Sequence, residues 1–215
     1  MKTDMRRIQF KNIVPAALLP IFASALLVGC GNPADGVQEA EVTVGSGESL
    51  EAVAGAKVYT LTSDSSIAFT GSKITGSHSG GFKAFTGSIS VADGVIVAPS
   101  KIEIDMDSTW SDSDKLTGHL KNSDFFDVPA FPTSTFVLTG IEQSGDSYSV
   151  TGDLTLHGVT KSIAFDAMID ITDSQLSLNA EFFIKRFDFD IVYEGKADNL
   201  IRDEVVIKLD VKAEA

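Results

Sequence analysis

The chain contains a single cysteine, Cys30, at a position typical of a lipid-attachment site. It ends the sequence Leu27-Val28-Gly29-Cys30, which follows a basic leader and an apolar stretch from Ile13 to Val28. The order of charge and hydropathy is typical of a secretory signal, and two prolines make the stretch a poor membrane span. The pattern predicts a bacterial lipobox, in which residues 1–29 are removed as a signal peptide and Cys30 is acylated.

Two other interpretations of this leader remain open. Ala23-Ser24-Ala25 is an ordinary cleavage site that would release a soluble protein, and Cys30 is a free thiol if the leader stays on as an anchor. We favour acylation, because unpaired thiols are a liability in an exported chain and disulfides need cysteines in pairs. Asp after the cysteine signals inner-membrane retention in many Gram-negative bacteria. Since Gly31 stands here, we expect a lipid anchor on the periplasmic face of the outer membrane.

The three histidines are the next candidates for chemistry, because imidazole is the commonest metal ligand. They are His78, His119 and His157. They fall on separate elements, and none has the close spacing of a metal-binding helix. Capping, turn geometry or a core hydrogen bond explains them better, so we predict no metal site. An enzyme that uses these histidines remains a third functional alternative.

Four aspartates lie close together and resemble a calcium-binding cluster. They are Asp105, Asp107, Asp112 and Asp114. The loop glycine and the final glutamate of an EF-hand are missing, so a solvated strand edge followed by a helix cap is the better interpretation. No Gly-x-Ser-x-Gly elbow occurs, which argues against a serine hydrolase. We therefore expect a protein that is not an enzyme.

The mature chain is strongly acidic. Removal of residues 1–29 leaves 13 basic and 29 acidic side chains and a formal charge of −16. This charge repels phosphate backbones, and no basic surface interleaved with aromatic residues is apparent, which argues against nucleic acid as a partner. Residues 30–56 are rich in Gly, Ala, Ser and Glu, and we interpret them as the acylated cysteine and a flexible tether with a reach of about 25 to 30 Å.

Apolar and polar residues alternate from Lys57 onward, as in half-buried antiparallel strands. The clearest strands cover residues 150–156, 163–171, 176–184 and 205–211. Hairpin turns at Asp93-Gly94, Gly145-Asp146 and His157-Gly158 give about eight strands in a meander. Eight strands with one apolar face each must close to cover that face, so the fold class is all-β, an eight-stranded antiparallel barrel over residues 57–215. One short helical insertion is expected at Ser111–Asn122, with Ser111 or Asp112 as its N-cap.

Small residues on the inward faces of these strands predict unfilled volume inside the barrel. Since many phenylalanines also fall on inward positions, we expect an apolar, aromatic pocket suited to a lipid tail. The predicted pocket lining is Phe82, Ala84, Phe136, Leu138, Gly152, Leu154, Phe165, Ala167, Ile169, Ala180 and Phe182.

Five segments between residues 58 and 212 form a specific combination of motifs. They are Ser66–Phe69; Gly76-Ser77-His78-Ser79-Gly80-Gly81-Phe82 with Phe85 and Gly87; Leu116–Val128; Phe131-Pro132 before Phe136; and Gly152–Lys161. Together they resemble the YceI-like family of exported lipid- or polyisoprenoid-binding proteins. The resemblance implies a lipocalin-like barrel around an elongated pocket for an isoprenoid or another long amphiphile. It implies no catalysis, and no cofactor besides a bound isoprenoid-like lipid.

The chain departs from the family at positions that bear on the ligand head group. Many family members have His where Lys73 aligns, and Arg-Asp where Lys115-Leu116 stands, whereas Arg186 matches a basic position of the family. We take Lys73, His78 and Arg186 as head-group candidates. Because burying an anion requires several cationic or backbone donors and the domain has few clustered cations, we expect a neutral head such as a quinone, an alcohol or an amide.

The sequence thus predicts a lipid-anchored barrel that stores or carries an isoprenoid-like lipid in the cell envelope, held at the membrane through its N-terminal acyl anchor. The strongest alternative is a filled barrel that acts as a structural or protein-interaction module without a ligand. The volume of the barrel interior separates the two.

Overall fold

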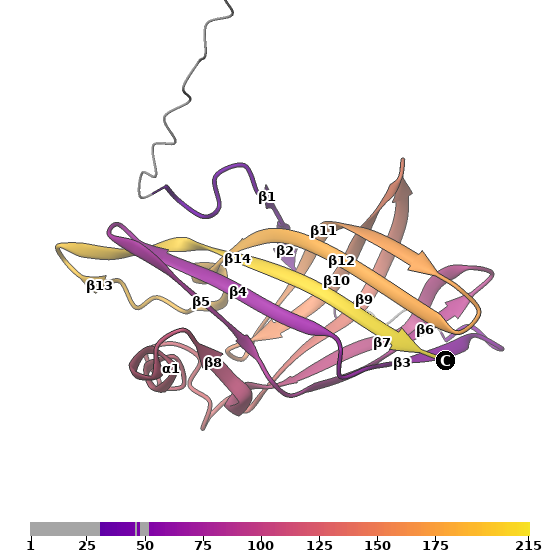
Figure 1. Cartoon of the computed structure of the whole chain (residues 1–215), viewed down its shortest axis with the longest axis horizontal. Coiled ribbons are helices and arrows are strands. Elements are labelled where there is room, and N and C mark those ends of the chain that lie inside the picture. Colours follow the sequence, from indigo (N-terminus) through magenta and orange to yellow (C-terminus); the bar gives the residue numbers. More distant parts are fainter. Residues whose placement is uncertain (1–30, 46, 48–51) are drawn as a thin grey trace, which may run out of the picture.

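The computed structural model describes residues 31–45, 47 and 52–215 (Figure 1). The predicted signal peptide and Cys30 lie outside the described residues. Within those residues, none of the helices has the length and hydropathy needed to cross a bilayer.

Eight long strands run in an antiparallel meander and close into a barrel. The first three strands are interrupted, and each appears as two elements: β3 (Lys57–Leu61) with β4 (Ser66–Lys73), β5 (Gly76–Phe82) with β6 (Phe85–Ala92), and β7 (Val95–Asp105) with β8 (Thr109–Ser111). The other five are β9 (Thr133–Ser144), β10 (Ser147–Leu156), β11 (Val159–Ile171), β12 (Gln175–Lys185) and β14 (Asn199–Glu214). Strand β14 pairs with β12 on one side and with β3 and β4 on the other, which closes the ring. The predicted all-β, eight-stranded barrel is confirmed.

The hairpin turns have the backbone conformations that the sequence predicts. Asp93 and Gly94 both have positive φ values, of 52° and 78°, and His157 and Gly158 have values of 52° and 76°. Positive φ at both central residues is the requirement of a type I′ turn, whose twist matches that of the strands it joins. The turns therefore help to fix the register in which inward residues face the barrel interior.

Strand β5 is a strand that the alternation of residue types does not predict, because five of its seven residues are Gly or Ser. Its glycines are required by neighbouring atoms. A Cβ atom on Gly80 would lie 2.4 Å from the Phe69 ring and 2.5 Å from the Trp110 carbonyl oxygen, and one on Gly81 would lie 2.6 Å from the Ile67 carbonyl oxygen. The absence of side chains at these positions of β5 leaves room for the Phe69 ring of β4.

The helical insertion is shorter than predicted. Helix α1 covers Asp114–Leu120, and its N-cap is Ser113, whose hydroxyl accepts a hydrogen bond from the Leu116 N–H. Ser111 instead ends β8, so neither predicted cap is used in that role. Two short 3-10 helices, η1 (Met106–Ser108) and η2 (Arg186–Phe189), and the short strand β13 (Gly195–Lys196) complete the domain.

The structure also differs from the predicted flexible tether. Residues 38–44 form β1 (Gln38–Glu39) and β2 (Glu41–Val44), which pair with β12 and β11 respectively (Figure 1). Ala40, between them, is only 1% exposed and belongs to the hydrophobic core. Backbone hydrogen bonding to strand edges does not require apolar periodicity, which explains why composition alone indicated a tether.

Candidate ligand-binding site

The barrel interior contains a cavity of about 230 Å³. Its wall is almost entirely aliphatic and aromatic, and every long strand of the barrel contributes to it. A water molecule takes up about 30 Å³ in the liquid, and cavities without polar partners stay dry. The space therefore suits an apolar chain much better than a polar solute.

Phenylalanine rings form two groups along the cavity wall. The Phe69, Phe82 and Phe126 rings lie with their centroids 5.8 to 6.3 Å apart beneath the α1 end of the barrel. The Phe165 and Phe182 rings stack at 4.2 Å with an interplanar angle of 13°, on β11 and β12. The separations in the first group fall within the range of about 4.5 to 7 Å that aromatic pairs prefer, and the stacked pair is slightly closer. The rings give the cavity a rigid wall with which an unsaturated hydrocarbon can make close contact.

Six of the eleven predicted lining residues line this cavity. They are Phe82, Phe136, Leu138, Leu154, Phe165 and Phe182. All six are large, and each lies on the inward face that the alternation predicts.

The other five predicted lining residues lie away from the cavity. Ala84 is exposed, because the chain leaves the strand between Phe82 and Phe85 and the inward alternation restarts one residue out of step. Ala167 and Ala180 are buried in the packed core, and Ile169 packs against it without reaching the cavity.

Gly152 shows most clearly why small inward residues do not imply empty space. A Cβ atom on Gly152 would lie 2.2 Å from the Phe136 ring, so the ring already occupies the volume that the glycine leaves. The cavity lies where large side chains on opposite walls do not contact each other. Its position therefore cannot be predicted from the size of any one residue.

Of the three predicted head-group candidates, only Arg186 lines the cavity. His78 lies outside the barrel and is paired with Asp112, and Lys73 ends β4 without reaching the cavity wall. Arg186 is 4% exposed and donates three hydrogen bonds to backbone carbonyls, those of Arg202, Ile191 and Ile201 at 3.0, 2.6 and 3.2 Å. Burial lowers the pKa of Arg186, while the charges of Asp203 and Glu194 oppose that shift. The guanidinium thus ties η2 and the following loop to β14.

One cationic side chain that lines the cavity, Arg202, was not among the predicted site residues. The Lys101 side chain lies on the outer face of β7, where it pairs with Glu103. The Arg202 Nε is buried without a hydrogen-bond partner. Arg202 precedes the regular alternation of β14, which begins at Val205, so the periodicity that located the other lining residues gives no signal there. Ser100 and Ser134 are further polar lining residues that the sequence did not indicate.

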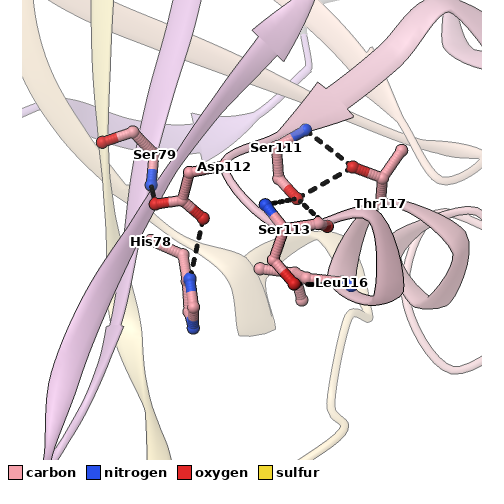
Figure 2. A network of polar contacts seen from close by, with 7 residues as sticks. All are labelled: His78, Ser79, Ser111, Asp112, Ser113, Leu116 and Thr117. Carbon is pink, nitrogen blue, oxygen red and sulfur yellow. Dashed lines mark hydrogen bonds and ion pairs between the residues drawn. The ribbon is translucent and has the colours of Figure 1, made fainter.

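A cap formed by β8, α1 and the turn that follows covers one end of the cavity through Leu120, Phe125 and Phe126. Figure 2 shows how its polar contacts fasten it to β5. The Asp112 carboxylate lies 2.8 Å from His78 Nδ1 and accepts a 3.0 Å hydrogen bond from the Ser79 N–H. These two contacts hold the pKa of Asp112 below its usual value, the Ser79 bond making the larger contribution.

The Thr117 hydroxyl completes the network of Figure 2. It accepts a hydrogen bond from the Ser111 N–H at 2.8 Å and lies 2.9 Å from the Ser111 hydroxyl. Strand β8 is thereby joined to the first turns of α1. The network is therefore a fastening for the cap, and it lies outside the cavity.

The remaining candidates for chemistry make local structural contacts. His119 pairs with Asp124, and His157 Nδ1 lies 3.1 Å from the Phe189 carbonyl oxygen. Asp105 accepts a hydrogen bond from the Asp107 N–H, and Asp107 pairs with Lys121. In the part of the chain that the structure describes, no three His, Cys, Asp or Glu side chains come together as metal ligands would.

Comparison with known proteins agrees with this architecture. The sequence profile of the YceI-like domain matches residues 59–213. A UPF0312 protein of Pseudomonas putida strain F1 is 44% identical over 71 residues, which are 32% of this chain and 37% of that protein. Protein YceI of Escherichia coli O6:H1 is 36% identical over 78 residues, or 36% of this chain and 38% of that protein. The matches thus span less than half of the length of these curated relatives.

Two solved structures have the same fold. BcnA of Burkholderia cenocepacia superposes with a TM-score of 0.63 and 22% identity, covering 69% of this chain and 96% of that one. A polyisoprenoid binding domain from Saccharophagus degradans, implicated in plant cell wall breakdown, gives a TM-score of 0.62 and 20% identity and covers 73% and 98%. Because the domain match extends over most of the barrel, the chain belongs to the YceI-like domain family.

Proposed function

We propose that this barrel binds a long apolar lipid of the isoprenoid class in its interior and stores or carries it, without catalysing a reaction. The observation that carries the proposal is the apolar cavity, with its aliphatic and aromatic wall. A filled barrel, the alternative from the sequence, would need no such space. The fold shared with the polyisoprenoid binding domain of Saccharophagus degradans supports the same ligand class.

We propose further that the ligand head is neutral or weakly polar. Arg186 already donates to three carbonyl groups, so a bound anion would have to compete with these backbone bonds. Arg202 is the residue that tests this proposal, because its buried Nε has no partner. A polyprenyl pyrophosphate that binds at least tenfold more tightly than the matching alcohol, and loses this preference in Arg202→Gln, would overturn the neutral head.

The cell-envelope setting is also part of the proposal. The lipobox-like sequence that ends at Cys30 supports a lipid anchor, and Gly31 after it supports the outer membrane. If a Cys30→Ser variant were still lipid-modified and still fractionated with membranes, the proposed anchor would be wrong.

Filling the cavity tests the binding proposal directly. Leu209 lines the cavity, whereas the adjacent Lys208 is exposed on the opposite face of β14. Leu209→Trp should lower the affinity for dansyl-labelled geranylgeraniol at least tenfold, and Lys208→Trp should leave it unchanged. Thermal unfolding of both variants checks that each is folded. Equal affinities in the two folded variants would contradict binding in this cavity.

A further inference from the structure

One seam of the barrel is completed by a segment that is not part of the eight long strands. Strands β11 and β12 pair directly only from Met168 opposite Asn179 to Ile171 opposite Leu176. Beyond this stretch, toward the α1 end, residues 38–44 lie between them. Val42 pairs with Ile163 of β11, and Gln38 pairs in parallel with Phe182 of β12. We call this interrupted part of the seam the β11–β12 gap, and residues 38–44 the plug strand.

The plug strand is part of the cavity wall's support. Ile163, Phe182 and Ile184 form the two edges of the gap, and all three line the cavity. Ala40 is buried in the same hydrophobic core, and its N–H donates a 2.9 Å hydrogen bond to the Phe183 carbonyl oxygen. Without the plug strand, this part of the wall would expose unpaired backbone groups and open directly onto apolar lining residues.

Both ends of the gap are held by other contacts. At the inner end, Phe165 and Phe182 stack across the diverging strands. At the outer end, the imidazole of His157 lies 3.1 Å from the Phe189 carbonyl oxygen, which joins the β10–β11 turn to η2. These two contacts hold β11 and β12 on either side of the gap. The distance between the two strands there therefore does not depend on the plug strand alone.

The plug strand itself is held weakly. Ala40 is its only fully buried residue, and Val44 is 83% exposed. Glu39 pairs with Lys185 at 2.6 Å, but both side chains are about half exposed, and exposed ion pairs add little stability. Segments with few buried apolar contacts and solvent-exposed backbone hydrogen bonds are the first to open in native proteins.

We propose that the plug strand is a displaceable gate, and that a long apolar ligand passes between solvent or membrane and the cavity through the β11–β12 gap. This inference rests on the proposed lipid-binding function. The neighbouring β10–β11 and β12–β14 seams are continuous ladders between two long strands, and the α1 end is covered by the cap and its polar network. Displacement of the plug strand opens the wall while the direct β11–β12 ladder stays paired.

A reversible disulfide tests the gate. Thr43 and Ser162 are register partners on the outer side of the seam, within the distance that a disulfide requires. Thr43→Cys with Ser162→Cys, in the full chain carrying Cys30→Ser, locks the plug strand when oxidised. The matched control is Glu142→Cys with Ser149→Cys, which bridges the β9–β10 seam, where the two strands pair directly with one register shift at Thr151 and Gly152.

The probe is dansyl-labelled geranylgeraniol, and its uptake is followed by stopped-flow fluorescence. Oxidation of the locked protein should slow uptake at least tenfold, a reductant should restore the rate, and the equilibrium affinity should change less than twofold. The control disulfide should not alter the rate. Uptake by the oxidised locked protein at the wild-type rate overturns the gate and leaves the binding function intact. No binding of the probe by the wild type would overturn the proposed function, and the gate with it.

Backbone amide exchange keeps the proposal testable if the cysteine variants do not fold. In the wild type, the Ala40 N–H should exchange at least tenfold faster than amides within the β9–β10 ladder. Equal protection would mean that the plug strand opens only with the whole barrel, which would overturn the gate.

Discussion

Two seams that share strand β11 differ in how they hold the barrel together. The β10–β11 seam is paired without interruption from Tyr148 opposite Ala167 to Leu156 opposite Val159. The β11–β12 seam depends on residues 38–44 over much of its length, and these residues lie outside the matched domain at 59–213. The comparison shows that the matched domain forms the closed ring of strands, whereas residues 38–44, outside that domain, complete one part of the barrel wall.

The largest expected difference in stability comes from introducing the same charged side chain into β11 and into the plug strand. Ala167 on β11 and Ala40 on the plug strand are 3% and 1% exposed. Ala167→Asp should lower the free energy of unfolding by about 3 kcal/mol or more, because it buries an unpaired carboxylate in a core strand that cannot detach from the barrel without global unfolding. Ala40→Asp should cost about 1 kcal/mol or less, because local opening limits the loss. Urea unfolding measures both, and a similar large loss for Ala40→Asp would refute the distinction between the seams.

A smaller effect is expected within the β9–β10 seam, whose two strands pair directly with each other. A methyl group on Gly152 would meet the Phe136 ring and the Val137 carbonyl oxygen, at 2.2 and 2.7 Å. Gly152→Ala should therefore destabilise the barrel by about 2 to 3 kcal/mol, in the range of overpacked cores. Gly140→Ala on the neighbouring strand is the control, since its Cβ atom would lie 3.6 Å from Thr151, an ordinary contact. If thermal unfolding cannot distinguish the two variants, this part of the wall is less rigid than the account requires.

The cap should respond to acid independently of either seam. Because the Ser79 N–H and His78 lower the pKa of Asp112, the carboxylate is favoured in the folded protein. Its contribution is present above the ordinary carboxyl pKa of about 3.9 and is lost as the pH falls through the lowered folded value. Exchange of the Ser79 amide should therefore rise in acid beyond its intrinsic pH dependence, and Asp112→Asn should remove that rise. A wild-type profile identical to that of the variant would show that the contact does not fasten the cap.

The smallest expected effect concerns the ion pair at the plug strand. Glu39 raises the pKa of Lys185, so the pair contributes below the ordinary lysine pKa of about 10.4 and is lost as the pH rises through the raised value. Glu39→Gln should speed exchange of the Ala40 amide a few-fold at neutral pH and leave β9–β10 amides unchanged. High salt should act in the same direction, because it screens exposed charges. An unchanged Ala40 rate would mean that backbone pairing alone retains the strand.

The sequence predicted the barrel because alternating residues and turn residues are local signals. The alternation holds on β10, β11, β12 and β14, and the turns at Asp93-Gly94 and His157-Gly158 have the expected positive φ values. It did not predict β5, since the glycines at 80 and 81 are explained only by the atoms of β4 and β8 that lie against them. It also did not predict β1 and β2, whose backbone pairing leaves little trace in residue type.

The residues of the candidate site could be predicted where the sequence showed which residues of a strand face the barrel interior. Phe165 and Phe182 were located because their strands alternate without interruption, whereas Ala84 was misplaced by the break after Phe82. Cavity volume depends on whether side chains from opposite walls meet, as the Phe136 ring does at Gly152. Arg202 lies in a polar stretch before the alternation of β14 begins, so its place at the cavity wall required the three-dimensional structure.

The central claim is that the cavity holds a long apolar lipid, and native mass spectrometry of the protein purified from its own host tests it most directly. The account predicts a complex heavier than the chain by the mass of an isoprenoid-like lipid. Organic extraction should release the lipid, and Leu209→Trp should greatly reduce it while Lys208→Trp retains it. A wild-type protein that carries no lipid from its host, and takes up none when isoprenoid lipids are supplied, would contradict the account.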